Sequence, residues 1–239
     1  MRWPERGTSG AAWQPHIRNA WQRTPSNSGK GFLAAQPESM SMRLEPHGPV
    51  NAELDPLTGL LNRRAATHLL DRFTTDASAN VPCSLILFDL DHLHYANQRF
   101  GHETIDVALN AVASLITARL PTASYAARFG GEEFLILLPG LSLAPAYAAA
   151  EAVRQAVQDF SFTPMDLRLT ISAGVACSPT KPTWTAMDLL MLADMRLCVS
   201  KKRLVRSRNT VWAGRLPCEW AAQHDEFNDW PAFDIAPDY

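Results

Sequence analysis

The sequence lacks several features that would assign it to a common class of protein. It has no run of about twenty apolar residues that could span a membrane, and its polar start, MRWPERGTSG, lacks the apolar core of a signal peptide. Charge of neither sign dominates, since the 239 residues carry a formal net charge of −2. The chain as a whole therefore has no attraction for nucleic acid or an anionic membrane. We expect a cytoplasmic protein with no membrane span and no nucleic-acid partner.

Cysteine is also scarce. The four cysteines are widely scattered and show neither CxxC nor His/Cys metal-ligand spacing. This pattern predicts reduced thiols rather than a zinc site. The only dense basic segment is 201–208, KKRLVRSR, in which five of the eight residues are Lys or Arg. A nucleic-acid binder using this segment is the weakest hypothesis, because one short segment offers few phosphate contacts.

The chain divides into three predicted regions. Residues 1–50 are rich in Pro, Gly, Ser and Gln and show no sustained periodicity, which predicts a largely disordered arm. Residues 211–239 form an acidic tail that contains tryptophans, either loosely packed or docked on the domain. A protein partner or a second copy could use either terminus. Residues 51–210 alternate helix-like and strand-like segments, which predicts one domain of the α+β class.

Periodicity and capping residues place the expected elements of this domain. Asp55 or Thr58 is expected to cap the first helix. Two strands flank a glycine turn at 130–133, which favours a hairpin. The expected helices are 60–72, 103–120, 145–160 and 185–202, and the expected strands are 83–88, 124–129, 134–138 and 167–175.

Three acids are expected to meet if the first strand lies beside the hairpin. Asp89 closes that strand, and Glu132 and Glu133 lie at the hairpin tip. Three carboxylates so close would repel one another, and a divalent cation is their natural partner. Gly130 and Gly131 would let a triphosphate approach the main chain, because glycine has no Cβ. Taken alone, GGEE at a turn is more often a solvated charged loop than a metal site.

Five motifs that follow one another along the chain argue against a simple solvated loop. They are DPLTGLLNRR (55–64), FDLDHLHYANQRFGHETID (88–106), RFGGEEF (128–134), LTISAGVA (169–176) and AD followed by a lysine (193–201). Together they resemble the GGDEF family of bacterial diguanylate cyclases, in a GGEEF variant. The resemblance implies a palm-like (ferredoxin-like) central sheet surrounded by helices, as in nucleotidyl cyclases. It also implies a signalling enzyme that condenses two GTP into cyclic di-GMP and releases two pyrophosphates.

The resemblance implies a cofactor and an assembly as well. The cofactor would be Mg²⁺ or Mn²⁺, and catalysis would require a homodimer in which each subunit holds one GTP. The metal ligands would be Asp89, the main-chain carbonyl of Leu90, Glu132 and Glu133. Glu132 would also accept the proton of the ribose 3′-hydroxyl, with Glu133 as the second catalytic acid.

The implied substrate residues lie on both sides of the turn. The rival readings are a helix cap for Asn97, a first-turn acid for Asp106 and an ordinary surface charge for Lys201. We expect Asp91 to be structural. By resemblance, the guanine-binding pair is Asn97 and Asp106, and the other substrate contacts are His102, Gly130, Gly131 and the phosphate-binding Lys201.

The match departs from the family in three places. His94 stands where the family has a lysine, and Ile105 stands where it has a glycine. The segment 196–208 is altered, so that the phosphate-binding arginine position falls on Val205 or, with an insertion, on Arg208. These changes keep open an alternative function, a degenerate GGDEF module that binds GTP or a partner protein without turnover.

Overall fold

The computed structural model describes residues 53–75, 81–162, 167–178, 184–202, 208–216 and 232. All of them belong to one compact unit of the chain, Ser41–Tyr239. The arm predicted for residues 1–50 and most of the tail predicted for 211–239 lie outside the described residues.

A mixed six-stranded sheet forms the centre of the domain, in the order β1-β3-β4-β2-β5-β6. β2, β3, β4 and β5 are joined in antiparallel pairs, and the short edge strands β1 and β6 are parallel to their neighbours. The α+β class predicted from the sequence is therefore confirmed. The strands are β1 (Leu61–Asn62), β2 (Cys83–Leu90), β3 (Tyr125–Arg128), β4 (Glu133–Pro139), β5 (Ile171–Cys177) and β6 (Val211–Trp212).

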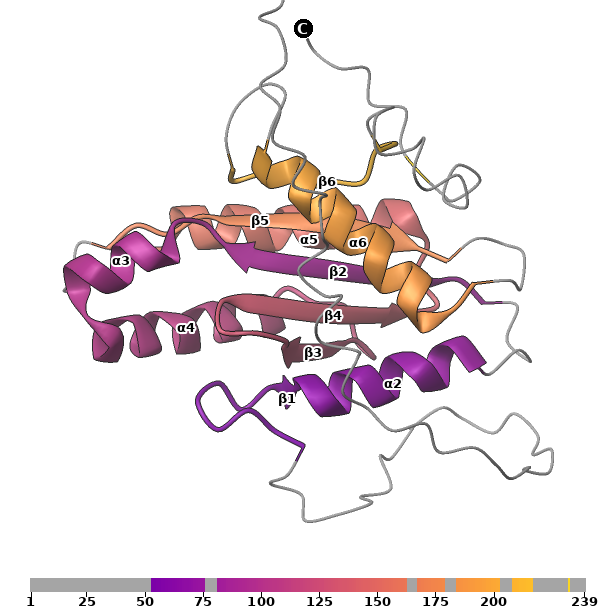
Figure 1. The fold of residues 1–239 in the computed structure, drawn as a ribbon, viewed down its shortest axis with the longest axis horizontal. Helices are drawn as coiled ribbons and strands as arrows, with labels where there is room; N and C mark the ends of the chain where they lie inside the picture. The colour runs from indigo at the N-terminus through magenta and orange to yellow at the C-terminus, as the bar shows by residue number, and fades with distance from the viewer. Residues whose placement is uncertain are drawn as a thin grey trace, which may run out of the picture. The chain divides into compact units, whose positions relative to one another are not determined.

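Helices cover both faces of this sheet. Figure 1 shows α6 and α2 in front of the strands and α4 and α5 behind them, with α3 at one end. The helices are α2 (Arg63–Thr75), α3 (Leu93–Phe100), α4 (His102–Thr117), α5 (Leu143–Asp159) and α6 (Ala186–Lys202).

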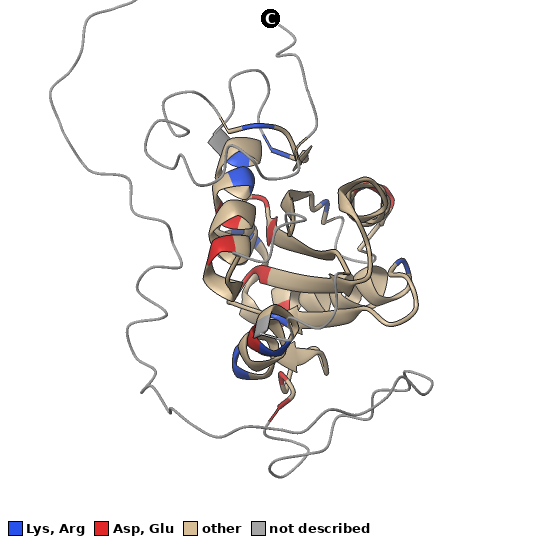
Figure 2. Cartoon of the chain, turned by 90° about the vertical axis from the view of Figure 1, so that its right-hand side faces the viewer, with Lys and Arg blue, Asp and Glu red and all other residues tan. Residues whose placement is uncertain are grey.

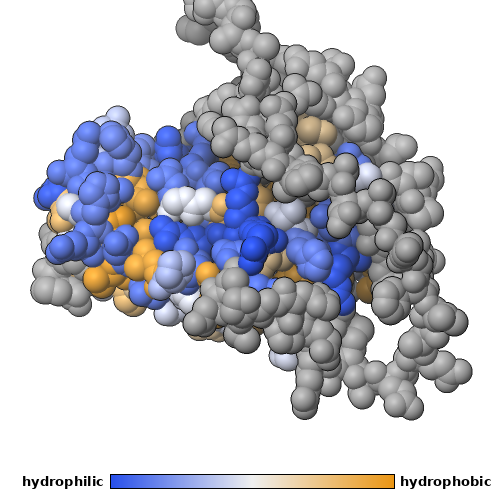
Figure 3. All heavy atoms as spheres, turned by 60° about the horizontal axis from the view of Figure 1, so that its bottom comes forward, coloured by the Kyte–Doolittle hydropathy of each residue, from blue (hydrophilic) through white to orange (hydrophobic). Residues whose placement is uncertain are grey.

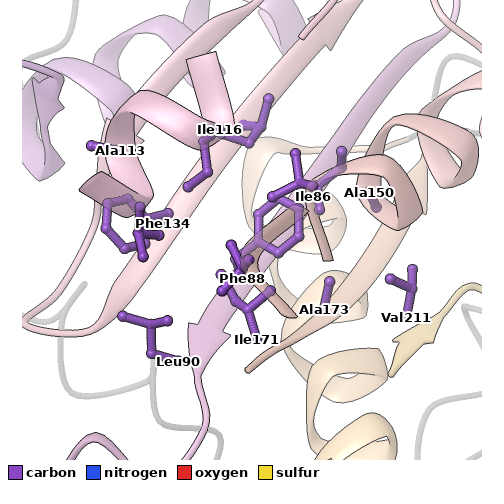
Figure 4. Packing of buried hydrophobic residues seen from close by; sticks show 14 of the residues in the cluster. Ile86, Phe88, Leu90, Ala113, Ile116, Phe134, Ala150, Ile171, Ala173 and Val211 are labelled. Carbon is purple, nitrogen blue, oxygen red and sulfur yellow. The ribbon is translucent and has the colours of Figure 1, made fainter. Parts of the chain in front are cut away.

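The side chains of β2 point alternately to the helices on the two faces of the sheet. Successive side chains of a strand point to opposite faces. Phe88 and Leu90 belong to the main core together with α4 and α5 residues, and Figure 4 shows Phe88 and Phe134 within this packing. Asp89 therefore lies on the opposite face, the one that α6 covers.

Two expectations about helices require correction. The first helix begins at Arg63, not at residue 60, because the Asn62 side chain accepts a hydrogen bond from the Ala65 amide (3.0 Å) and so caps it. Asp55 and Thr58 form a turn that precedes the helix instead. The short helix α3 was not predicted. Its eight residues, LHYANQRF, are too few and too polar to give a clear periodicity.

The sheet extends past the predicted domain boundary at residue 210. Val211 and Trp212 form β6, which pairs with Ala173 and Gly174 of β5. Val211 and Ala213 are buried in the main core. The first residues assigned to the tail are thus part of the domain.

One face of the described domain is mixed in polarity. Figure 3 shows a face on which hydrophobic residues appear in small patches among hydrophilic ones. Among the helices of the described segments, none is long and apolar enough to cross a membrane. Cys83, Cys177 and Cys198 are buried. Burial raises the pKa of the Cys83 thiol to about 12, which leaves it protonated and unreactive at neutral pH.

Candidate active site

The ends of β2 and β4 bring the predicted acids to one edge of the sheet. Asp89 lies directly opposite Glu133 in the antiparallel pair, and side chains in that relation share a face. The Leu90 amide donates to the main-chain carbonyl of Glu132 (3.2 Å). The strand that carries Asp89 therefore lies beside the glycine turn, which is the condition under which the sequence placed the three acids together.

The glycine turn itself is tight. The amides of Phe129 and Gly130 both donate to the carbonyl of Glu133, at 2.8 and 3.2 Å. A Cβ on Gly130 would overlap the carboxylate of Glu133, whereas a Cβ on Gly131 would meet open space. Gly130 thus makes room for a side chain of the turn, which is a reason for glycine that the sequence did not indicate.

Arg128 contacts both this turn and Asp55, near the start of the domain. Its guanidinium donates to the carbonyl of Gly131 (2.8 Å) and lies 3.4 Å from a carboxylate oxygen of Asp55. The same Asp55 oxygen accepts hydrogen bonds from the amide and hydroxyl of Thr58 at 2.9 and 2.7 Å. Burial alone would raise the pKa of Asp55, but the Thr58 hydrogen bonds and the Arg128 charge together lower it. Arg128 and the DPLTG turn therefore support the shape of the glycine turn.

Lys201 reaches the acidic edge from α6. Figure 2 shows the basic residues at the C-terminal end of this helix. The ammonium group of Lys201 forms an ion pair with Asp89. Burial raises the pKa of Asp89, and the Lys201 charge opposes that effect only in part. Lys201 is thus part of the site and not an isolated charge on a solvated helix face.

Glu132 lies in the same electrostatic environment. Burial raises its pKa, and the negative charges of Asp89 and Glu133 raise it further, against the effect of Lys201. A set of carboxylates that repel one another, with a main-chain carbonyl alongside, matches the oxygen ligands that Mg²⁺ and Mn²⁺ prefer. In the described part of the chain, no three acidic, His or Cys side chains are already arranged around one metal position. In the free chain, the Asp89 carboxylate forms an ion pair with Lys201 instead.

The raised pKa of Glu132 has a consequence for stability. Because the folded-state pKa lies above its unfolded value, ionised Glu132 destabilises the metal-free fold at neutral pH. This penalty shrinks as the pH falls below the folded-state pKa and is gone once the pH lies below the unfolded value. We expect Glu132→Gln to raise the melting temperature in EDTA at pH 7, with a gain that shrinks toward acid pH. Thermal denaturation of both proteins across pH measures this, and a destabilised variant at every pH would contradict it.

The residues expected to bind guanine lie on α3 and α4. Asn97 lies within α3 and does not cap a helix, because His92 and Gly101 occupy the two cap positions. Its side-chain oxygen is buried and has no hydrogen-bond partner among the described residues, which leaves an acceptor available to a ligand. His102 and Asp106 are exposed on α4. Within the described residues, no hydrogen bond or ion pair joins Asn97, His102 or Asp106 to Asp89 or Glu132.

The altered positions fall in different environments. His94 is exposed on α3, and its ring lies 2.9 Å from the side-chain amide of Gln98. Ile105 is buried in the main core, so its side chain points away from the surface that carries Asp106. Arg208 lies 3.8 Å from a carboxylate oxygen of Asp91 and acts electrostatically on Asp89 and Glu132. Val205 lies outside the described residues.

The fold and this edge define an α+β domain with a cluster of acids at a hairpin of its central sheet. The family model described as "Diguanylate cyclase, GGDEF domain" matches residues 52–206. The chain therefore belongs to the GGDEF family of diguanylate cyclases, as the motifs indicated.

Individual relatives agree with this assignment. Diguanylate cyclase DgcP of Pseudomonas aeruginosa is 38% identical over 124 residues, which are 51% of this chain and 18% of that protein. Diguanylate cyclase DosC of Escherichia coli is 30% identical over 167 residues, 68% of this chain and 36% of that protein. The chain thus spans well under half the length of these relatives.

Solved structures resemble the domain as well. The GGDEF domain of DgcB from Caulobacter crescentus, in complex with c-di-GMP, has a TM-score of 0.61 at 28% identity and covers 77% of this chain and 97% of its own. The active GGEEF domain of a diguanylate cyclase from Vibrio cholerae has a TM-score of 0.59 at 27% identity, with coverages of 64% and 96%. The diguanylate cyclase SiaD from Pseudomonas aeruginosa, solved with its activator SiaC, has a TM-score of 0.60 at 30% identity, with coverages of 66% and 60%.

Proposed function

We propose that this protein is an active diguanylate cyclase. The 3′-hydroxyl of one GTP attacks the α-phosphorus of the other and releases pyrophosphate, and a second attack in the opposite sense closes the ring. The observation that carries the proposal is the meeting of Asp89, Glu132 and Glu133 at one sheet edge, with Lys201 in contact with Asp89. Membership of the family supports the same reaction.

Glu132 is the proposed proton acceptor. Its raised pKa suits this role, because a base works best when its pKa approaches the working pH. Asp89, the Leu90 carbonyl, Glu132 and Glu133 would hold Mg²⁺ or Mn²⁺. When bound, the metal would make the 3′-hydroxyl more acidic and stabilise the charge on the leaving pyrophosphate.

The positive side chains at the site bind the triphosphate in this proposal. Lys201 neutralises Asp89 in the free chain, and it would exchange that carboxylate for phosphate oxygens when nucleotide and metal arrive. Arg208 is a second phosphate ligand, since its charge already acts on Asp89 and Glu132. Gly131 leaves open space beside the turn for the incoming phosphates.

Guanine is the proposed ligand of Asn97 and Asp106, with His102 as a further substrate contact. An amide and a carboxylate can together accept from and donate to the edge of guanine. The buried, unpartnered oxygen of Asn97 supports this role.

A substitution at Asn97 tests guanine binding. We expect Asn97→Ala to weaken GTP affinity by about tenfold, the cost of about one hydrogen bond in a buried site. Affinity for Mg²⁺-tripolyphosphate, which has no base, should not change. Isothermal titration of both ligands measures the difference, with Asn110→Ala, an exposed position on α4, as the matched control. Equal losses for the two ligands would argue against a contact with the base.

Catalysis in this proposal requires a homodimer, because each subunit presents one GTP and the two must face each other. The termini could bring in a partner protein. The reaction would take place in the cytoplasm, where GTP is available and where cysteines such as Cys83 stay reduced.

The alternative is a degenerate module that binds GTP or a partner protein without turnover. His94 favours it, because an imidazole replaces the lysine, with its permanent charge, that the family places near the phosphates. Incubating the purified chain with GTP and Mg²⁺ at high protein concentration and measuring cyclic di-GMP separates the two. Product would support the cyclase, and GTP binding without product would support the degenerate module.

A further inference from the structure

The carboxylate of Asp91 has more hydrogen-bond partners than the proposed chemistry explains. Asp91 is 3% exposed and follows β2 by one residue. Its Oδ1 accepts from the Ser172 hydroxyl (2.9 Å) and its Oδ2 from the Thr170 hydroxyl (2.8 Å). Oδ2 also accepts from the main-chain amide of Asn209 at 2.7 Å. Asp91 thus joins the end of β2 to β5 and to a segment more than a hundred residues later.

That later segment has an unusual backbone. Arg208 and Asn209 have φ angles of +61° and +53°, a left-handed conformation that costs arginine about 1 kcal/mol or more and that asparagine adopts more readily. Two in succession persist only if neighbours hold them. Asn209 is held by Asp91 through its amide and by Arg154 and Gln158 of α5 through its side chain, at 3.1 and 2.9 Å.

The backbone turn directs Arg208 to the acidic edge. Its guanidinium lies 3.8 Å from Oδ1 of Asp91, and the side chain is 33% exposed. The Arg208 charge also reaches Asp89 and Glu132. The buried Asp91 can fix one side of the guanidinium, while the exposed part remains free to meet an anion at the site.

We propose that Asp91 is a positioning residue for Arg208, and that this pair determines how strongly the site binds the triphosphate of GTP. Through the Asn209 amide, Asp91 holds the left-handed turn, and through its charge it holds the guanidinium beside the site. Without that carboxylate the turn relaxes and Arg208 moves toward solvent. The inference rests on the proposed function, because it takes GTP as the ligand.

The test uses the full chain and 3′-deoxy-GTP, which has no attacking hydroxyl and so reports binding alone. We expect Asp91→Asn to weaken binding of Mg²⁺-3′-deoxy-GTP by about tenfold or more, the value of a charge-assisted contact. Binding of guanosine, which has no phosphate, should stay the same. Thr170→Val is the matched control, since it removes another hydrogen bond to the same Asp91 oxygen but leaves Asn209 and Arg208 held. It should bind both ligands as the unmodified chain does.

A double-mutant cycle separates positioning from general support of the fold. Arg208→Met should lose as much triphosphate affinity as Asp91→Asn, and the double variant should lose little more. Fully additive losses, or an equal loss of guanosine affinity in Asp91→Asn, would overturn the proposal. Unchanged affinity in Arg208→Met would also overturn it but would leave the cyclase function standing, because cyclic di-GMP formation is measured separately.

Discussion

Glu132→Gln is expected to reduce cyclic di-GMP formation by a factor on the order of 10²–10⁴, the usual value of a positioned general base. The glutamine has the same shape but cannot accept the proton of the 3′-hydroxyl, and it is a weaker metal ligand. Burial and the Asp89 charge raise the pKa of Glu132 in the free chain, which makes this carboxylate a stronger proton acceptor than an ordinary glutamate. Quantifying product by chromatography after incubation with GTP and Mg²⁺ measures the effect.

The controls separate lost chemistry from lost structure. Asp71→Asn makes the same acid-to-amide change at an exposed position of α2, and it should retain full turnover. Because Glu132→Gln should also be more stable than the unmodified chain in EDTA, unfolding would not explain its inactivity. Turnover within a few-fold of the unmodified protein would show that Glu132 is not the base.

Gly174→Ala is expected to have the largest effect on folding. Gly174 lies in β5 directly beneath α6, and an added Cβ would overlap the carbonyl oxygen of Ala193 and the amide nitrogen of Leu197. Both are main-chain atoms of a helix, so no side chain can move aside. The helix must shift away from the sheet, at a cost of about 3 kcal/mol or more, a large share of the stability of a typical domain. Chemical denaturation measures the loss.

Gly131→Ala is the matched control for that substitution. A Cβ there meets no atom within 4 Å, and its backbone is not among the positive-φ positions. We expect unchanged stability or a gain of about 0.4–1 kcal/mol, since alanine restricts the unfolded chain. If both alanine variants unfolded at the same denaturant concentration, the close approach of α6 to β5 would not be a structural requirement.

Local sequence patterns predicted most elements of this fold. The hairpin of β3 and β4 followed from glycines between two apolar runs, a signal that acts over a few residues. The strand at 83–88 followed from a short continuous apolar run, and the helix at 103–120 from hydrophobic periodicity. The start of α2 was misplaced because Asp55 and Asn62 are both good caps, and only the packed structure decides which one caps the helix. α3 was missed because a short polar helix depends on its neighbours for stability.

The candidate site was also predicted only in part from the sequence. The motifs identified Asp89, Glu132 and Glu133, and the pairing of β2 with β4 confirms that their strand ends lie together. The assignments of metal, base and substrate roles remain predictions. The ion pair of Lys201 with Asp89 and the turn at Arg208 could not be predicted, because each joins residues that are over a hundred positions apart in the chain.

By itself, the sequence determined the family, the acidic turn and the types of side chain available for catalysis. These properties are encoded in short motifs whose chemistry does not depend on distant residues. Only the tertiary structure decided which charges neutralise one another in the free protein and which arginine the site contains. Those outcomes depend on burial, which changes pKa values and the strength of ion pairs, and burial is set by how α6 and the 208–210 turn pack against the sheet.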